Sequence, residues 1–183
     1  ALGKIIGGGF PVGAVAGSAE VMAVFDPRRE KTLLPHSGTF NANPLSAAAG
    51  VAMLGQIAEG DVTERANEQG DKLKAAWNAV FAAEGVPWAT FGLGSSVYVF
   101  TNPDGLDIDP ENFDATLQPI QVMEIGGNHP ACKSFRLAML VNGVDISPKP
   151  GGIVSAVHGD DDIAEAAEAV RASIAMLKAE GQL

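Results

Sequence analysis

Apolar positions at helical spacing indicate two consecutive helices near the middle of the chain. Asn43 and Pro44 form a typical helix start, because asparagine caps a helix N-terminus and proline fits its first turn. The pattern therefore predicts a helix from residue 44 to about Gly60. A second helix follows and ends near Gly85, and its apolar stripe consists of Leu73, Trp77, Val80 and Phe81.

The N-terminal residues have the composition of strands rather than of a long helix. "ALGKIIGGG" at residues 1–9 reads as the end of a strand that enters a glycine turn, and residues 10–18 read as a buried strand rich in small residues. Residues 19–25 predict about two helical turns.

The C-terminal half alternates short strands with helices. Residues 86–102 predict two short strands with a glycine junction, followed by an acidic, turn-rich loop at 103–114. A helix is expected to end at Asn142-Gly143, and "GGIVSAVH" at residues 151–158 predicts another strand. A final helix is expected from a cap at Asp160 or Asp161 to about Ala179.

Interleaved strands and helices without internal repeats place the chain in the α/β class. Residues 1–60 carry four basic and four acidic side chains, so the formal charge of −10 lies entirely in residues 61–183. We therefore expect a domain boundary near residues 60–65, with the end of an α/β domain at 1–60 and a smaller α+β domain at 61–183.

Composition excludes several classes of function. A charge of −10 argues against non-specific binding to nucleic acid or to an anionic membrane, which needs clustered lysine and arginine. Cys132 is the single cysteine in the sequence, so an internal disulfide or a cysteine-rich zinc site is excluded and a cytoplasmic location is expected. The sequence starts without methionine and in an apparent strand end, so we expect it to be a C-terminal portion.

Lys4 is the only charged residue between Ala1 and Glu20, and three glycines follow at residues 7–9. In an apolar, charge-poor setting the ammonium form of a lysine is disfavoured, and its neutral amine can attack a carbonyl carbon. Glycines beside it let the backbone approach a flat ring or a phosphate. The alternative is a strand-end lysine whose stem packs while its ammonium reaches water.

The stretch "HSGTFNANPLS" at residues 36–46 offers hydroxyls at Ser37 and Thr39 and backbone amides around Gly38. Such donors just ahead of a helix start suit a phosphate group, although a purely structural loop has the same composition. The glycine spacings of dinucleotide and nucleoside-triphosphate loops do not occur, so a nucleotide enzyme is not indicated.

Together, "LGKIIGGGFPVGAVAGSAEVM" and "HSGTFNANPLSAAAGVAML" resemble the class III, fold-type I pyridoxal-phosphate aminotransferases, most closely the branch that includes glutamate-1-semialdehyde aminomutase. The resemblance is nearly continuous over residues 2–54, weaker at "GLGSSVYVF", and returns over residues 139–177. It implies that residues 1–60 end the large pyridoxal-phosphate-binding domain and that residues 61–183 form the small C-terminal α+β domain.

The resemblance also implies roles for individual residues. Lys4 matches the lysine that holds the cofactor aldehyde as a Schiff base and then transfers the proton. Thr39 matches the threonine that binds the cofactor phosphate across a homodimer interface, and Gly38 or Phe40 adds a backbone amide. The family's ring-stacking aromatic, its aspartate opposite the pyridine nitrogen and its glycine-serine phosphate loop all precede the lysine, so we expect this chain to carry half a site.

Other polar residues have two interpretations each. His36 suits either a proton carrier or a packed loop histidine. Arg136 and Lys149 suit either a substrate carboxylate or a solvated surface, the former because "SPKPGG" matches a segment near the family's active-site entrance. His129 and His158 do not have metal-ligand spacing with Cys132, and the acids at 160–162 are expected to complement a helix dipole.

The expected function is that of a pyridoxal-5'-phosphate-dependent aminotransferase, which moves an amino group between an amine or amino acid and a keto acid, ketone or aldehyde through Lys4. Small-molecule substrates and a homodimer with site residues from both subunits are expected, without nucleic-acid or membrane partners. One alternative is an aminomutase-type isomerase, because the same lysine chemistry serves both reactions. The other is an inactive truncated fragment, because the 183-residue chain alone is expected to be incomplete.

Overall fold

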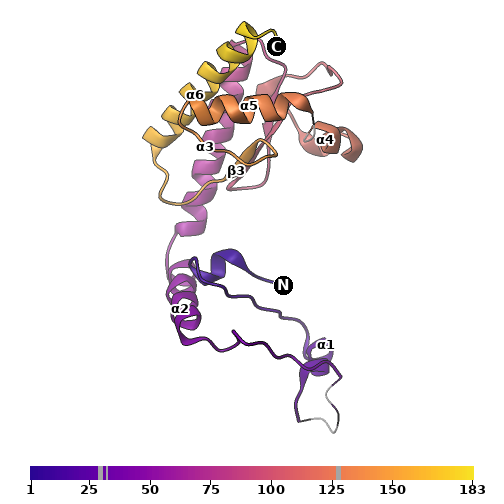
Figure 1. Cartoon of the computed structure of the whole chain (residues 1–183), viewed down its shortest axis with the longest axis vertical. Coiled ribbons are helices and arrows are strands. Elements are labelled where there is room, and N and C mark those ends of the chain that lie inside the picture. Colours follow the sequence, from indigo (N-terminus) through magenta and orange to yellow (C-terminus); the bar gives the residue numbers. More distant parts are fainter. Residues whose placement is uncertain (29–30, 32, 127–128) are drawn as a thin grey trace. The chain divides into compact units, whose positions relative to one another are not determined.

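The computed structural model describes residues 1–28, 31, 33–126 and 129–183, and the chain divides into two compact units (Figure 1). Unit 1 is Ala1–Asp61 and unit 2 is Val62–Leu183. The division falls within the stretch where the charge balance of the sequence changes. Helices and strands occur together in the chain, as the α/β pattern predicts.

Unit 1 contains one long helix and several short helical turns. The described elements are the 3-10 helix η1 (Lys4–Gly7), α1 (Ala19–Met22), the 3-10 helix η2 (Ala23–Phe25) and α2 (Pro44–Glu59). The two helical turns expected over residues 19–25 are confirmed. Helix α2 is also confirmed, and the Asn43 carboxamide oxygen accepts hydrogen bonds from Leu45 N at 3.0 Å and Ser46 N at 3.2 Å.

The strands expected over residues 1–18 are wrong for this chain. Residues 4–7 form the turn of η1, and residues 10–18 are almost all exposed. Within the described part of unit 1, only Leu2 and Ala14 form a β-bridge, with N–O distances of 2.7 and 2.9 Å. A strand needs a hydrogen-bonded neighbour along its length, and here the neighbour exists at one position.

Unit 1 buries few of its own side chains. Of its described residues, Ile6, Gly7, Ser46 and Gly50 are buried. Large apolar side chains are instead exposed on every segment, among them Leu2, Ile5, Val15, Val21, Phe40, Leu45 and Val51. Full burial of one such side chain is worth about 1.5–3 kcal/mol, so this unit gains little hydrophobic stabilisation from its own packing.

Unit 2 contains an antiparallel sheet of three short strands in the order β1-β2-β3, namely Ala89–Phe91, Ser96–Phe100 and Gly151–Ile153. Thr90 lies opposite Val99, and Val97 lies opposite Gly152. Both strands expected in residues 86–102 are therefore confirmed. The third strand is shorter than the sequence suggests, because the chain turns after Ile153 and the Ser155 amide donates to His158 Nδ1.

Three long helices complete the core of unit 2 (Figure 1). Helix α3 (Val62–Ala83) contacts β1, β2 and α6 (Asp160–Ala179), and α5 (Pro130–Val141) contacts α6. The expected stripe on α3 faces this core, where Trp77, Val80 and Phe81 are buried. The rings of Phe81, Trp88 and Phe135 meet edge to face, with centroids 5.2–6.5 Å apart.

Helices α3 and α6 are joined by ion pairs at two levels. Lys72 Nζ lies 2.5 Å from a carboxylate oxygen of Asp160, at the start of α6. Beyond the end of α3, Glu84 accepts from Lys178 Nζ and Arg171 Nη1, both at 3.1 Å. The hydrogen bond from Lys178 is the main reason that the pKa of Glu84 lies below its usual value.

The segment between β2 and α5 is built from short turns. It contains the 3-10 helices η3 (Pro110–Asn112) and η4 (Ala115–Leu117), capped by Asp109 and Asp114, and helix α4 (Ile120–Gly126). The acidic residues that predicted a turn-rich loop therefore act partly as caps. In the part of the chain that the structure describes, no helix has the length and apolar character needed to cross a membrane.

Gly70 provides a test of how tightly α3 packs on the β1–β2 turn. A Cβ at Gly70 would lie 2.5 Å from Gly94 O and 2.7 Å from Ser95 Cα. Gly70→Ala adds helix propensity worth up to about 1 kcal/mol, but displacing that backbone costs roughly 1–3 kcal/mol. We expect a net loss in the free energy of unfolding, measured by urea titration.

Gly152→Ala is the matched control, because a Cβ at Gly152 meets no atom within 4 Å and the change should stay within about 0.5 kcal/mol. The two tryptophans of the chain, Trp77 and Trp88, both lie in unit 2, so tryptophan fluorescence follows the unfolding of this unit. A Gly70→Ala protein as stable as the Gly152→Ala protein would contradict the close contact.

Candidate active site

Lys4 lies at the start of η1 with its backbone in the left-handed region, at φ 53°. A non-glycine residue held there costs on the order of 1–3 kcal/mol, and such residues cluster at functional sites. The side chain is exposed, so the described part of unit 1 does not supply the apolar setting expected from the sequence. Lys4 forms no ion pair with any described residue.

The glycines that follow Lys4 allow η1 to pack closely on α2. Gly8 has φ 55°, and a Cβ there would lie 3.3 Å from Ala49 O. On the helix side, a Cβ at Gly50 would lie 3.3 Å from Ile6 O. The lysine therefore stands on a turn whose backbone is fixed against the longest helix of unit 1.

The loop ahead of α2 forms a compact turn that leaves donors open. Asn41 N donates to Gly38 O at 3.0 Å, and Asn43 N donates to Phe40 O at 3.3 Å. Within the described residues, the amides of Gly38, Thr39 and Phe40 and the Thr39 hydroxyl have no hydrogen-bond partner. All three residues are exposed, so this turn presents a set of donors suited to an anion.

The helix start contributes less to this anion site than the sequence suggests. The first free amides of α2, those of Leu45 and Ser46, already donate to the Asn43 side chain. A phosphate at this loop would therefore be bound mainly by the turn at residues 38–40 and less by the helix N-terminus.

A cavity of about 360 Å³ lies within unit 1 beside this loop. His36, Phe40 and the buried Ser46 line it, and the His36 ring meets the Phe25 ring edge on at 6.0 Å. Lys4 and Thr39 are not among its lining residues. The structure therefore brings Phe40 and His36 to one cavity, and it places Lys4 on a separate turn.

The remaining candidates have structural roles in unit 2. His129 Nδ1 accepts from Ala131 N at 3.3 Å and caps α5, a role that the sequence interpretation missed because histidine is not among the usual caps. Asp162, not Asp160 or Asp161, closes the start of α6 by accepting from Gly159 N at 2.7 Å. In the described parts of both units, no three histidine, cysteine or acidic side chains are grouped to hold a metal ion.

Three charged residues of unit 2 differ in their surroundings. Arg136 Nε donates to Ile146 O at 2.7 Å and Nη2 lies 3.6 Å from Asp145, so this guanidinium is engaged within the unit. Lys149 lines an apolar cavity of about 350 Å³ together with Phe91, Tyr98 and Met123. Asp160 is paired with Lys72, whose hydrogen bond lowers the pKa of Asp160.

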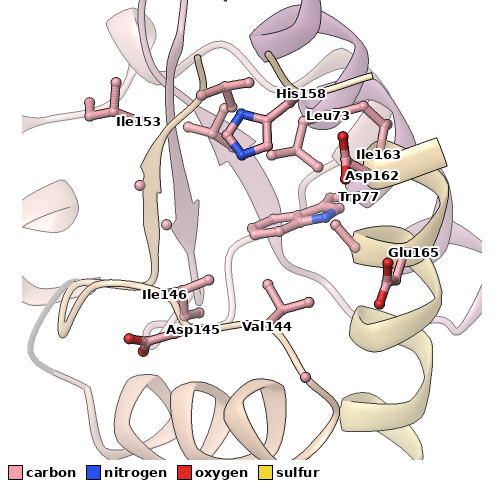
Figure 2. A pocket seen from close by; sticks show the side chains of 16 residues that line it. Leu73, Trp77, Val144, Asp145, Ile146, Ile153, His158, Asp162, Ile163 and Glu165 are labelled. Carbon is pink, nitrogen blue, oxygen red and sulfur yellow. The ribbon is translucent and has the colours of Figure 1, made fainter. Parts of the chain in front are cut away.

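A further cavity, of about 340 Å³, lies in unit 2 among α3, β3, α6 and the segment before β3 (Figure 2). Trp77 forms part of its wall, and His158, Asp145, Asp162 and Glu165 also line it. No pattern in the sequence indicates this cavity, because its lining comes from five separate segments that meet only in the fold.

Comparison with known proteins bears on both loops of unit 1. Residues 1–89, which include Lys4 and Thr39, match the family described as aminotransferase class-III. The chain is 30% identical over 170 residues to a glutamate-1-semialdehyde 2,1-aminomutase of Methanosarcina acetivorans. This alignment covers 92% of this chain and 36% of that protein. The chain is 47% identical over 94 residues to a β-phenylalanine transaminase of Variovorax paradoxus. This alignment covers 51% of this chain and 21% of that protein.

Among solved structures, a transaminase with PLP bound superposes with a TM-score of 0.79 at 32% identity, covering 98% of this chain and 38% of that one. The match of residues 1–89 to the class-III aminotransferases, together with these relatives, supports the resemblance that the sequence indicated. It spans little more than a third of the length of the Methanosarcina protein and of the solved transaminase.

The cap formed by His129 can be tested directly. His129→Ala removes the acceptor for Ala131 N, so we expect the free energy of unfolding of unit 2 to fall by about 0.5–2 kcal/mol in urea titrations followed by tryptophan fluorescence. His129→Asn keeps an acceptor and should restore most of the loss. Equal destabilisation by both substitutions would mean that the ring packs rather than caps.

Proposed function

We propose that the protein is a pyridoxal-phosphate-dependent aminotransferase that moves an amino group between an amine or amino acid and a keto acid, ketone or aldehyde. The observation that carries this proposal is Lys4. It is an exposed amine without an ion-pair partner in the described structure, on a strained left-handed turn inside the segment that matches the family. In this proposal, unit 1 is the end of the large domain and unit 2 is the small domain.

The residues present fit the cofactor at two of its groups. The amides of Gly38, Thr39 and Phe40 and the Thr39 hydroxyl are open donors, which suit a doubly charged phosphate. The Lys4 amine suits an aldehyde carbon. Pyridoxal phosphate supplies the electron sink that accepts the negative charge developing on the substrate carbon.

Lys4 has a second role in this proposal, as the group that moves the proton. Its amine Nζ takes the proton from the substrate carbon and returns it at the neighbouring position, so it serves as base and then as acid. A four-carbon stem on a fixed turn allows Nζ to reach both positions while the backbone stays in place. The turn at 38–40 orients the phosphate end, and it thereby limits the positions open to the reacting atoms.

An aminomutase-type isomerase is the second candidate, because the Methanosarcina relative named as one aligns with 92% of this chain. The same proton transfer by Lys4 serves an isomerisation within one molecule. Turnover of glutamate 1-semialdehyde without an added amine would favour the isomerase, and dependence on an external amine and a keto acid would favour the aminotransferase. Cytoplasmic location stays a prediction, and an inactive fragment remains the alternative to both.

Lys4 is expected to be the attachment point of the cofactor. Treatment of the complete protein with pyridoxal phosphate and then with borohydride, which fixes an imine as a stable amine, should label Lys4 in peptide maps. Lys4→Arg keeps the charge and should lose the label, while Lys31→Arg, at another exposed lysine of unit 1, should keep it. A label on Lys31 or Lys149 instead of Lys4 would contradict the assignment.

The proposed homodimer builds each site from two chains, and a mixing experiment tests this. If Thr39 binds the cofactor phosphate of the partner subunit while Lys4 serves its own site, a mixed dimer of the complete protein, formed from Lys4→Ala and Thr39→Ala chains, contains one site with both residues intact. Activity and cofactor binding should then rise above those of either parent after subunit exchange.

The same mixture distinguishes the alternative arrangement. With both residues in one subunit's site, every site in the mixed dimer keeps one lesion and no gain appears. Intact mass measurements under native conditions establish that exchange has occurred. No gain after verified exchange would therefore overturn the crossed arrangement.

A further inference from the structure

The cavity of unit 2 around Trp77 has the size and walls of a small-molecule site. Its volume is about 340 Å³, within the range of cavities that hold small organic ligands. Leu73 and Trp77 of α3 form part of its apolar wall, and Val144, Ile146 and Ile163 close it from the opposite elements (Figure 2).

Trp77 adds an unmet polar group to this wall. The residue is 2% exposed, and its indole Nε1 has no hydrogen-bond partner among the described residues. A buried N–H without an acceptor is unfavourable, but a cation brings no acceptor to it, so this group does not contribute to the binding of a cation. His158 stands on another side of the cavity, and its Nδ1 already accepts from Ser155 N at 3.0 Å.

The charged groups around the cavity are mainly acidic. Asp145, Asp162 and Glu165 are all lining residues. Asp145 has the Arg136 guanidinium 3.6 Å away, and one oxygen of Asp162 accepts from Gly159 N. Glu165 has no ion pair or hydrogen bond with the described residues. With Arg136 counted against the three acids, an excess of negative charge remains.

The helix dipole does not account for this arrangement. It favours acids in the first turn of α6, where Asp162 lies, and its effect declines beyond that turn. Asp145 comes from the segment before β3, and Glu165 lies beyond the capped turn. Carboxylates from two separate segments therefore border one apolar cavity, and this charge distribution complements a cation.

We propose that this cavity binds an organic ammonium ion with an apolar body. The apolar part lies against Trp77, Val144 and Ile146, and the cation lies toward Glu165 and Asp162. The indole face of Trp77 adds a favourable surface for a cation or an aromatic ring. A carboxylate ligand is disfavoured, because the acids around the cavity repel it.

Benzyltrimethylammonium is a suitable probe, because its quaternary nitrogen has no proton and cannot condense with an aldehyde. Its binding is therefore independent of the proposed transamination, and failure of either proposal leaves the other intact. We expect a dissociation constant on the order of 1 mM by calorimetry, as befits a small ligand. Benzyl alcohol and phenylacetate should each bind at least about tenfold more weakly, because they lack the positive charge.

The position of the probe can be read from the two tryptophans. In protein labelled with 5-fluorotryptophan, the ¹⁹F resonance of Trp77 should shift on titration, while that of Trp88 should move much less. Trp88→Phe assigns the two signals by removing one. A shift of Trp88 alone, or equal binding of phenylacetate and benzyltrimethylammonium, would overturn the proposal.

Two substitutions on α6 form a matched pair. Glu165→Gln removes the uncommitted acid and should weaken binding of the probe about five- to tenfold. Asp161→Asn makes the same charge change on the same helix at a residue outside the lining, and it should change binding less than about twofold. Equal effects of the two would show general charge attraction and would overturn a site at Glu165.

Ala166→Leu tests the cavity itself, because the larger side chain occupies part of its volume. The Ala166→Leu protein should no longer bind the probe. A urea titration followed by tryptophan fluorescence should still show a cooperative unfolding transition, which establishes that the variant is folded. If the variant does not fold, Glu165→Gln decides the question, since that side chain makes no contact on which the fold depends. Unchanged binding in folded Ala166→Leu would overturn the assignment of the cavity.

Discussion

The edge-to-face contacts of Phe81, Trp88 and Phe135 are the interaction on which unit 2 depends. These rings come from the end of α3, the approach to β1 and the middle of α5, and their centroids form a triangle with sides of 5.2, 5.9 and 6.5 Å. Each such pair is worth about 0.5–1.5 kcal/mol beyond the burial of its area. The end of α3 and the start of β1, which are neighbours in the sequence, are thereby joined to the distant helix α5, and the strands and α6 pack around this point.

The elements that the sequence predicts correctly are those set by nearby residues. Asn43 and Pro44 start α2 through hydrogen bonds that span two and three residues, and the stripe on α3 is visible as a period in the sequence itself. The strands expected over residues 1–18 failed because a strand depends on a distant neighbour, and the pattern of one segment contains no information about its partner. The same reason explains why the cavity around Trp77 has no sequence signal.

The candidate site is predictable to a similar extent. Lys4 and the loop at residues 36–43 stand out in the sequence by their isolation and their composition. The sequence does not reveal that Asn43 consumes two amides of α2, or that the turn at residues 38–40 keeps its own amides open. Those facts follow from the backbone path, including the left-handed Ala42 at φ 58°. The motif therefore identifies the residues, and the local geometry decides which of their groups can bind an anion.

The ion pairs between α3 and α6 have a consequence for how the two helices are aligned. Lys72 meets Asp160 near the start of α6, and Glu84 meets Arg171 and Lys178 farther along, so the two helices run in the same direction. Each exposed pair adds little to stability. A slip of α6 by one helical turn, about 5.4 Å, would separate both sets at once and bring uncharged residues such as Ala164 and Ala175 opposite Lys72 and Glu84. Two weak ion-pair sites at distant points of the helices thus select one register of α6 against α3. The apolar interface alone would tolerate several registers.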